Sequence, residues 1–448
     1  MTAELTRRTK LMYGVGDIGF SLTSTILAAY YAIFMVDVIG LRPGIAAIAI
    51  FIGKSWDYIN DPIFGYISDR TRTRWGRRRP YLLFGALPLA LTFTMLWYRP
   101  DFESTFALAA YYSVAYIIFE ASATLLYMPY FALTPELTSD YDERTSLTSY
   151  RMFFSILGSL LAFTVPWMIV GSFTPENAPK VLLMGAIFGL ISALPMFVTF
   201  FGTKESEDYI ELDKPSFRES IKSVWENVPF RYSLGIFLAT WITVDILQTS
   251  LVFYVTYVIQ RGPQIDIIMA SIFVVAMFAL PIWNWVSLRW SKRYAYMYGI
   301  AFWAVVQLFL ISMTPETPLS FIFVLCSMAG IGVAAAHVLP WAILPDAIEW
   351  YEYKTGERHE GMFYSFTTLA RKIASSIAIP LILLLLDVTG YQPNVLQQNS
   401  RALWGIRLVI GPIPAVLLAI GIFVAYKYPL DRKEFLKIVE ELKKRRAA

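Results

Sequence analysis

Three charged residues, Lys54, Asp57 and Asp61, lie in the stretch KSWDYINDP (54–62), within a segment that is otherwise apolar enough for a lipid bilayer. On an α-helix, residues four apart lie about 40° apart around the axis and about 6 Å apart along it, so both carboxylates share one face. Lys54 joins that face and can form an ion pair with them. Paired carboxylates with nearby hydroxyl and carbonyl oxygens suit a small hard cation or a shared proton. The alternative is a salt-bridge cluster that only stabilises a helix bundle, although buried ion pairs add little net stability.

Two further acids lie in apolar stretches. Asp17, in YGVGDIGFS, is surrounded by glycines that permit close helix packing, and Asp245 is followed by Gln248 and Thr249. Each acid can be either a cavity-facing substrate contact or a structural hydrogen-bonding residue. Neither histidine supports metal catalysis, because His337 stands alone in an apolar stretch and His359 lies in a polar loop. The sequence contains no catalytic triad, phosphate-binding glycine loop or zinc-site spacing. We therefore expect no enzymatic activity and no bound cofactor.

The composition requires these residues to be positioned by membrane helices. Of 448 residues, 56% are hydrophobic and 16% charged, which a soluble globule could not bury. Apolar stretches long enough to cross a bilayer recur along the chain, and we count about twelve. The predicted spans are 11–36, 44–67, 80–98, 105–134, 150–171, 181–201, 231–259, 265–288, 294–313, 316–343, 362–388 and 403–427.

The distribution of Lys and Arg predicts the orientation. Basic residues concentrate in alternate loops and in both terminal segments, and such residues stay on the cytoplasmic side. We therefore expect a multi-pass protein of the cell inner (plasma) membrane with both termini cytoplasmic and no removable signal peptide. The net charge of +4 needs no nucleic-acid partner, because the basic residues follow the topology and attract membrane lipid headgroups. The single cysteine, Cys326, excludes a disulfide framework within the chain.

The chain divides into two similar halves. LYMPYFALTPEL (126–137) resembles HVLPWAILPDAI (337–348), about half a chain later. Parallel repeats of six spans are typical of transporters with two helix bundles and a midplane substrate site. We expect a bundle carrying the cation site at 1–202, a cytoplasmic linker at 203–230, a second bundle at 231–428 and a cytoplasmic tail at 429–448.

The basic loop DRTRTRWGRRRPY (69–81) has two interpretations. Its arginines set the topology and attract lipid headgroups, or some of them form an ion-pair latch that closes the cytoplasmic side. For the latch we expect Asp69, Arg70, Arg77 and Arg144, with acidic partners at Asp69 and in the loop at Asp140, Asp142 and Glu143.

Several motifs together resemble the glycoside-pentoside-hexuronide:cation symporters of the major facilitator superfamily, whose melibiose transporters are the best-known members. They are YGVGD, WDYINDPIFGYISDRTRTRWGRRRPY, PYFALTPEL, ERTSLTSYRMFF, YSFTTLARKIASS and TGYQPN, and the resemblance covers nearly the whole chain. The span-two motif is the most specific. The resemblance implies an all-α membrane protein with twelve helices in two six-helix bundles, which imports a sugar, glycoside or hexuronide with a cation.

The resemblance also implies site residues. Asp57 and Asp61 match the family's cation-binding aspartates, Thr124 its cation-site threonine, and Lys54 and Lys372 its basic residues on the second and eleventh spans. We expect the cation to be bound by Asp57, Asp61, Asn60 and Thr124, with Lys54 balancing the charge. Sodium is the first choice for the coupling ion, and a proton or lithium is the alternative.

Two departures concern the substrate. The family's galactoside-binding aspartate on the fourth span falls at Tyr127, and its first-span aspartate falls at Ser21, with Asp17 one turn earlier. LPWAILPDAIEW (339–350) and HEGMFYSF (359–366) also resemble the sodium-coupled lysophospholipid symporters of vertebrates. A lysolipid is therefore the second candidate substrate, and a non-transporting membrane sensor of the same fold is a third possibility.

One chain contains a whole pathway, so we expect a monomer. The expected substrate contacts are Asp17, Ser21, Tyr127, Arg151, Trp341 and Lys372.

Overall fold

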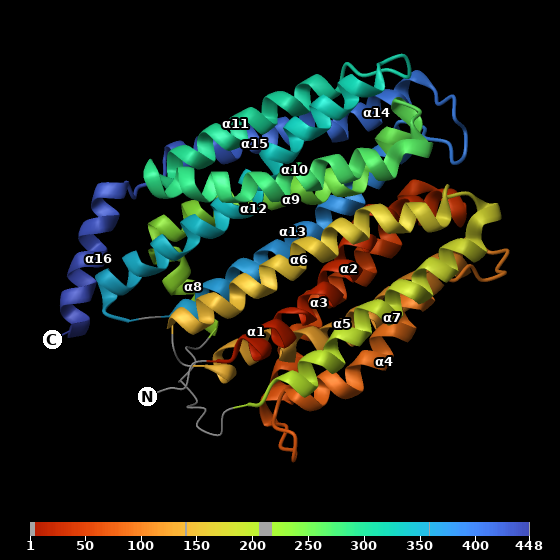
Figure 1. The fold of residues 1–448 in the computed structure, drawn as a ribbon. Coiled ribbons are helices and arrows are strands. Elements are labelled where there is room, and N and C mark those ends of the chain that lie inside the picture. Colours follow the sequence, from red (N-terminus) through yellow and green to blue (C-terminus); the bar gives the residue numbers. More distant parts are fainter. Residues whose placement is uncertain (1–4, 139–140, 206–216, 358, 448) are drawn as a thin grey trace. The chain divides into compact units, whose positions relative to one another are not determined.

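The computed structural model describes residues 5–138, 141–205, 217–357 and 359–447. Within these residues the chain is helical, and its sole β interaction is an isolated bridge between Thr73 and Gly76. A helix or a run of helices occupies each of the predicted spans (Figure 1). The prediction of an all-α fold is confirmed.

The chain separates into two compact units. Unit 1 comprises Met1–Glu211, Gly262–Asp266 and Ile379–Ala402, and unit 2 comprises Leu212–Arg261, Ile267–Ala378 and Leu403–Ala448. The first 211 residues contain α1 (Arg7–Gly14), α2 (Gly16–Ile26), η1 (Leu27–Tyr31), η2 (Phe34–Val38), α3 (Pro43–Arg70), α4 (Arg79–Leu96), α5 (Thr105–Leu137), α6 (Tyr141–Val170), η3 (Pro175–Asn177) and α7 (Ala178–Gly202). The later helices are α8 (Phe217–Glu226), α9 (Val228–Phe253), η4 (Tyr254–Val258), η5 (Gly262–Gln264), α10 (Ile265–Arg289), α11 (Lys292–Leu310), α12 (Leu319–Thr355), α13 (Glu360–Val388), α14 (Ser400–Ile410), α15 (Pro412–Tyr426) and α16 (Arg432–Ala447).

Ten helical segments in the described part of the chain are long and apolar enough to cross a membrane. Neither α3 nor α11 is among the ten. For α3 the reason is its charged residues, which lower the hydropathy of the segment and are the same residues that suggest a cation site.

The first span of each half ends in a π-helix. In the first half these are η1 and η2, and in the second half η4 follows α9 directly. π-helical turns inside α-helices are rare, so their recurrence at equivalent places supports the internal repeat that the sequence suggested.

Close helix contact in unit 1 depends on the glycines around Asp17. A Cβ atom built on Gly19 of α2 would lie 2.2 Å from the carbonyl oxygen of Ser192 in α7, closer than any side chain allows. The expectation that these glycines serve helix packing is confirmed at this position.

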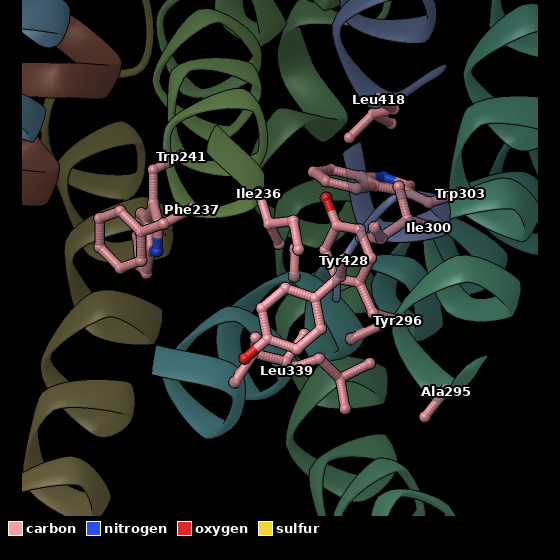
Figure 2. Close-up of a cluster of buried hydrophobic side chains, with 14 of the residues drawn as sticks. Ile236, Phe237, Trp241, Ala295, Tyr296, Ile300, Trp303, Leu339, Leu418 and Tyr428 are labelled. Carbon is pink, nitrogen blue, oxygen red and sulfur yellow. The ribbon is translucent and has the colours of Figure 1, made fainter. Parts of the chain in front are cut away.

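A buried hydrophobic cluster joins α9, α11, α12 and α15 in unit 2. Figure 2 shows Tyr296 and Trp303 of α11 at its centre, with Phe237 and Trp241 of α9 side by side at one end. The start of α9 is fixed by Asn227, whose side chain accepts from the Phe230 N–H at 3.0 Å and donates to the Ala347 carbonyl of α12 at 2.9 Å. These contacts hold α9 against α12.

The helix α12 continues beyond the predicted span, which ended at residue 343. Its last turns contain the polar sequence EWYEYKT, and it ends where Gly356 adopts a left-handed conformation with φ of 77°. Hydropathy finds the membrane-spanning part of a helix and not its polar extension, whereas a left-handed glycine is a common helix terminus.

Candidate functional site

The candidate cation site is built on α3, which runs without interruption from Pro43 to Arg70. Lys54, Asp57 and Asp61 are half-buried on this helix, and each has an interaction partner. The continuous helix places the two aspartates one turn apart, as the spacing predicted.

The helix α5 packs beside α3 (Figure 1). Thr124 of α5 donates a hydrogen bond from its hydroxyl to the side-chain oxygen of Asn60 at 3.1 Å. Both residues are buried, with exposed fractions of 6% for Thr124 and 1% for Asn60. Asn60 lies three residues after Asp57 and one before Asp61, so this hydrogen bond joins α5 to the segment of α3 that carries both aspartates.

Close packing of these two helices is possible because α3 has glycine at position 53. A Cβ atom there would lie 2.4 Å from the Cβ of Tyr116. Asp57 and Glu120 both lie within electrostatic range of the Tyr116 hydroxyl. Glu120, one turn before Thr124, is therefore a further carboxylate near the site, although the spacing on α3 gave no reason to include it.

The substrate residues predicted in the first half gather where α2, α5 and α6 meet. Asp17 of α2 is almost fully buried and pairs with Arg151 of α6, with 3.3 Å between Oδ2 and Nε. The guanidinium of Arg151 also lies over the ring of Phe131, 4.6 Å from its centre. A buried acid is thus compensated by a basic residue on another helix.

Ser21 and Tyr127 lie near this pair. Ser21 shares a hydrogen bond of 2.7 Å with Ser155, one turn beyond Arg151 on α6. The Tyr127 hydroxyl is 3.4 Å from Thr23 Oγ1 of α2, and its ring packs edge-on against Phe20. The position at which the resemblance predicted a counterpart of the galactoside-binding aspartate is therefore a buried aromatic residue in this chain.

The other two predicted substrate residues belong to unit 2. Trp341 of α12 is 37% exposed, stacks on Tyr364 of α13 with 6.4 Å between ring centres, and meets the Phe237 ring edge-on. Lys372 of α13 is half-buried and has an interaction partner. Arg371, which is not among the predicted site residues, lies 4.0 Å from Asp245 and packs on Trp241.

The loop before α4 binds two glutamates that are not among the predicted latch residues. Glu136, at the end of α5, accepts from Arg77 Nη2 at 2.7 Å and from Arg78 Nε at 3.1 Å, and all three side chains are buried. Glu205, after α7, accepts from the backbone N–H groups of residues 77, 78 and 79. The expected acidic partners of Arg77 were therefore incomplete, because the helix ends bring Glu136 and Glu205 to the loop. Glu136 belongs to the motif PYFALTPEL, which was the one available signal.

The other residues predicted for the latch make different contacts or lie outside the described residues. Arg70 is exposed and lies over the Tyr66 ring, 4.0 Å from its centre. Glu143 pairs with Lys10 of α1 at 2.9 Å. Asp140 and the side chains of Asp69, Asp142 and Arg144 lie outside the described residues.

Comparisons with known proteins agree with this architecture. An uncharacterized symporter of Synechocystis, sll1374, is 29% identical over 98% of this chain and 96% of its own length. The sodium-dependent lysophosphatidylcholine symporter 1-A of Danio rerio is 28% identical over 96% of this chain and 87% of its own length. Among solved structures, a D-xylose-proton symporter has the same fold, with a TM-score of 0.67 at 16% identity, covering 94% of this chain and 97% of the other.

The family model described as MFS/sugar transport protein matches residues 12–432, which is most of the chain. The ten long apolar helical segments of the described residues indicate a multi-pass membrane protein. The chain therefore belongs to the MFS/sugar transport protein family of membrane transporters and has the fold of the major facilitator superfamily.

Proposed function

We propose that the protein is a sodium-coupled symporter in which Asp57, Asp61, Asn60 and Thr124 bind the coupling ion. The observation that carries the proposal is the hydrogen bond between α5 and α3, in which a buried hydroxyl meets a buried amide on the segment of α3 that carries both carboxylates. Carboxylate, amide and hydroxyl oxygens are the ligands that hard cations prefer. The relatives named as sodium-dependent symporters align along nearly the whole chain, which supports sodium over a proton.

Coupling follows from linkage between the two ligands. Sodium at the α3 site raises the affinity for substrate, and substrate raises the affinity for sodium by the same factor. Transport then proceeds by alternating access, with the ion gradient driving uphill import of the substrate. Lys54 balances the two carboxylates while the site contains no ion.

A lysophospholipid is the first candidate substrate. The relatives whose names state a lysophosphatidylcholine substrate cover 95–97% of this chain at 26–28% identity. The aromatic residue at position 127, in place of the galactoside-binding aspartate, also favours a substrate other than melibiose. A sugar or glycoside is the second candidate, because the matching family model is described by sugar transport.

The membrane arrangement is part of the same proposal. We place the protein in the plasma membrane as a monomer with both termini cytoplasmic, within the glycoside-pentoside-hexuronide:cation group. The bundles at 1–202 and 231–428 would perform transport, and the latch at Asp69, Arg70, Arg77 and Arg144 would close the cytoplasmic side.

Transport assays in proteoliposomes test this function. Purified protein is reconstituted and given an inward sodium gradient, with labelled lysophosphatidylcholine or labelled glycosides outside. We expect accumulation that requires sodium and is lost in Asp57→Asn and Asp61→Asn, while Asp101→Asn, on an exposed loop, behaves as wild type. Sodium-dependent binding without accumulation would identify a sensor. Accumulation that follows a pH gradient and ignores sodium would overturn the choice of ion.

A further inference from the structure

A partly exposed charge pair in unit 2 joins α9 to α13. The guanidinium Nη2 of Arg371 lies 4.0 Å from the Oδ1 of Asp245, and the side-chain exposed fractions are 36% for Arg371 and 10% for Asp245. Both residues lie well inside helices that are long and apolar enough to cross a membrane. Ionisable residues at such depth are expensive, and where they occur they commonly mark a substrate or ion pathway.

Asp245 uses little of the binding capacity of Arg371. A guanidinium carries five N–H donors in a fork that matches a carboxylate or phosphate with two parallel hydrogen bonds. The contact with Asp245 involves one terminal nitrogen and is longer than a hydrogen bond. The more exposed member of the pair is the cation, so an incoming anion can reach it.

Trp241 fixes the position of the guanidinium. The Arg371 Cζ atom lies 3.8 Å from the centre of the Trp241 ring, so a cation–π interaction holds the guanidinium over the indole. Trp241 itself is 9% exposed and packs against Phe237, as Figure 2 shows, and against His337 of α12. The guanidinium is therefore held by stacking and still has nitrogen atoms available for a ligand.

The indole N–H of Trp241 is a second polar group near the cation. The indole nitrogen of Trp241 is buried and has no hydrogen-bond partner among the described residues. A buried donor without a partner costs free energy, which a ligand oxygen would recover. This observation is independent of the ion pair and also points to an acceptor-rich ligand.

An apolar wall continues from this point. Phe237 contacts both Trp241 and Trp341, and Trp341 stacks on Tyr364. Trp341 is 37% exposed, so part of its surface can contact an apolar chain or the face of a sugar ring. Charge at one end and aromatic surface beside it suit an amphiphile with one anionic group.

We propose that Arg371 is the binding site for a single anionic group of the transported substrate, a phosphate ester or a carboxylate, which takes the place of Asp245 as the partner of the guanidinium. The proposal rests on the symport function above and specifies its substrate class as anionic. The anion can belong to a lysophospholipid or to a hexuronide, and matched ligand pairs separate the two sources.

Equilibrium binding to the full chain in nanodiscs, in sodium, tests the proposal. The first pair is 1-oleoyl lysophosphatidate and 1-oleoylglycerol, which differ by the phosphate. The second pair is octyl glucuronide and octyl glucoside, which differ by the carboxylate. Wild type should bind the anionic member of one pair about tenfold or more tighter than the neutral member, since hydrogen bonds to charged groups contribute about one to two factors of ten. The pair that shows the preference identifies the source of the anion.

Substitutions test whether Arg371 causes the preference for the anionic ligand. Arg371→Gln should reduce it about tenfold, and Arg371→Lys should reduce it in part because the charge remains and the fork is lost. Asp245→Asn should increase anion affinity by removing the competing carboxylate. The control is Arg231→Gln, which removes an exposed arginine that also lies over an indole ring, that of Trp225, and should leave the preference unchanged.

The outcomes separate this proposal from the symport proposal. An equal preference in wild type and Arg371→Gln, or no binding of either anionic member, would overturn the Arg371 site. Repeating the titrations with potassium in place of sodium reports on coupling. An anion preference that depends on Arg371 but is indifferent to sodium would support this site and contradict sodium coupling.

Discussion

Glutamine in place of Glu136 should destabilise unit 1 strongly. The Glu136 carboxylate is 3% exposed and is bound by Arg77 at 2.7 Å and Arg78 at 3.1 Å, whose side chains are 10% and 8% exposed. A glutamine has nearly the same shape, so the change removes the negative charge and leaves two buried cations without it.

The expected loss can be worked out from this burial. Breaking a buried pair by neutralising one partner costs about 3–5 kcal/mol, whereas an exposed pair contributes about 0–1 kcal/mol. The burial of all three side chains places Glu136 in the first class. A loss of this size is a large share of the stability of an ordinary domain, about 5–15 kcal/mol.

Unfolding in mixed micelles, followed by circular dichroism while the denaturing detergent is increased, measures the loss. The matched control is Glu440→Gln in α16, which removes one partner of the exposed pair with Lys444 and should leave the unfolding midpoint unchanged. A double variant, Glu136→Gln with Arg77→Gln, should lose less than the sum of the two single changes, because the residues interact. If Glu136→Gln unfolds within about 1 kcal/mol of wild type, the pair is screened by solvent and the reasoning from burial is wrong.

Three further predictions concern the helix contacts. Thr124→Val should weaken sodium binding about tenfold by removing a hydroxyl ligand, whereas Thr124→Ser should preserve it; equal sodium titrations for the two variants would exclude a ligand role. Gly19→Ala should reduce the yield of monodisperse protein in gel filtration, because the new Cβ would lie 2.2 Å from a carbonyl oxygen of the facing helix. The control Gly361→Ala, whose new Cβ has nothing within 4 Å, should keep the wild-type yield, and similar yields for the two variants would refute the close-contact argument. Asp17→Asn should weaken substrate binding about fivefold or more, because it releases the buried Arg151 from its ion pair. An unchanged dissociation constant would show that neither residue belongs to the substrate site.

Local patterns in the sequence were enough to predict the helices and the face that carries the acids. The spacing of Asp57 and Asp61 determines their common face once the segment is a helix, and α3 is continuous there. The contact between Asn60 and Thr124 could not be derived from spacing, because the two residues are 64 positions apart and lie on different helices. The resemblance to the symporter family suggested Thr124 as a cation-site residue but did not predict this contact.

Pairing between distant charges was predictable only in part. The latch prediction named Asp69 and the acidic loop at 140–143 as partners, but Glu136, 59 residues from Arg77, forms the buried pair. Which acid meets which base depends on where helices end and how they pack, and a single sequence contains no direct signal for that. Arg371 was overlooked for a similar reason, since only packing against Trp241 distinguishes it from the adjacent Lys372.

Direct sodium binding tests the central claim most simply. Isothermal titration calorimetry of the full chain in nanodiscs, in a sodium-free buffer, would compare wild type with Asp57→Asn, Asp61→Asn and the exposed control Asp101→Asn. Gel filtration and circular dichroism would first show that every variant is folded. We predict saturable sodium binding for wild type and Asp101→Asn and none for the two α3 variants. If folded Asp57→Asn and Asp61→Asn bind sodium as tightly as wild type does, the ion binds elsewhere and the α3 site is wrong.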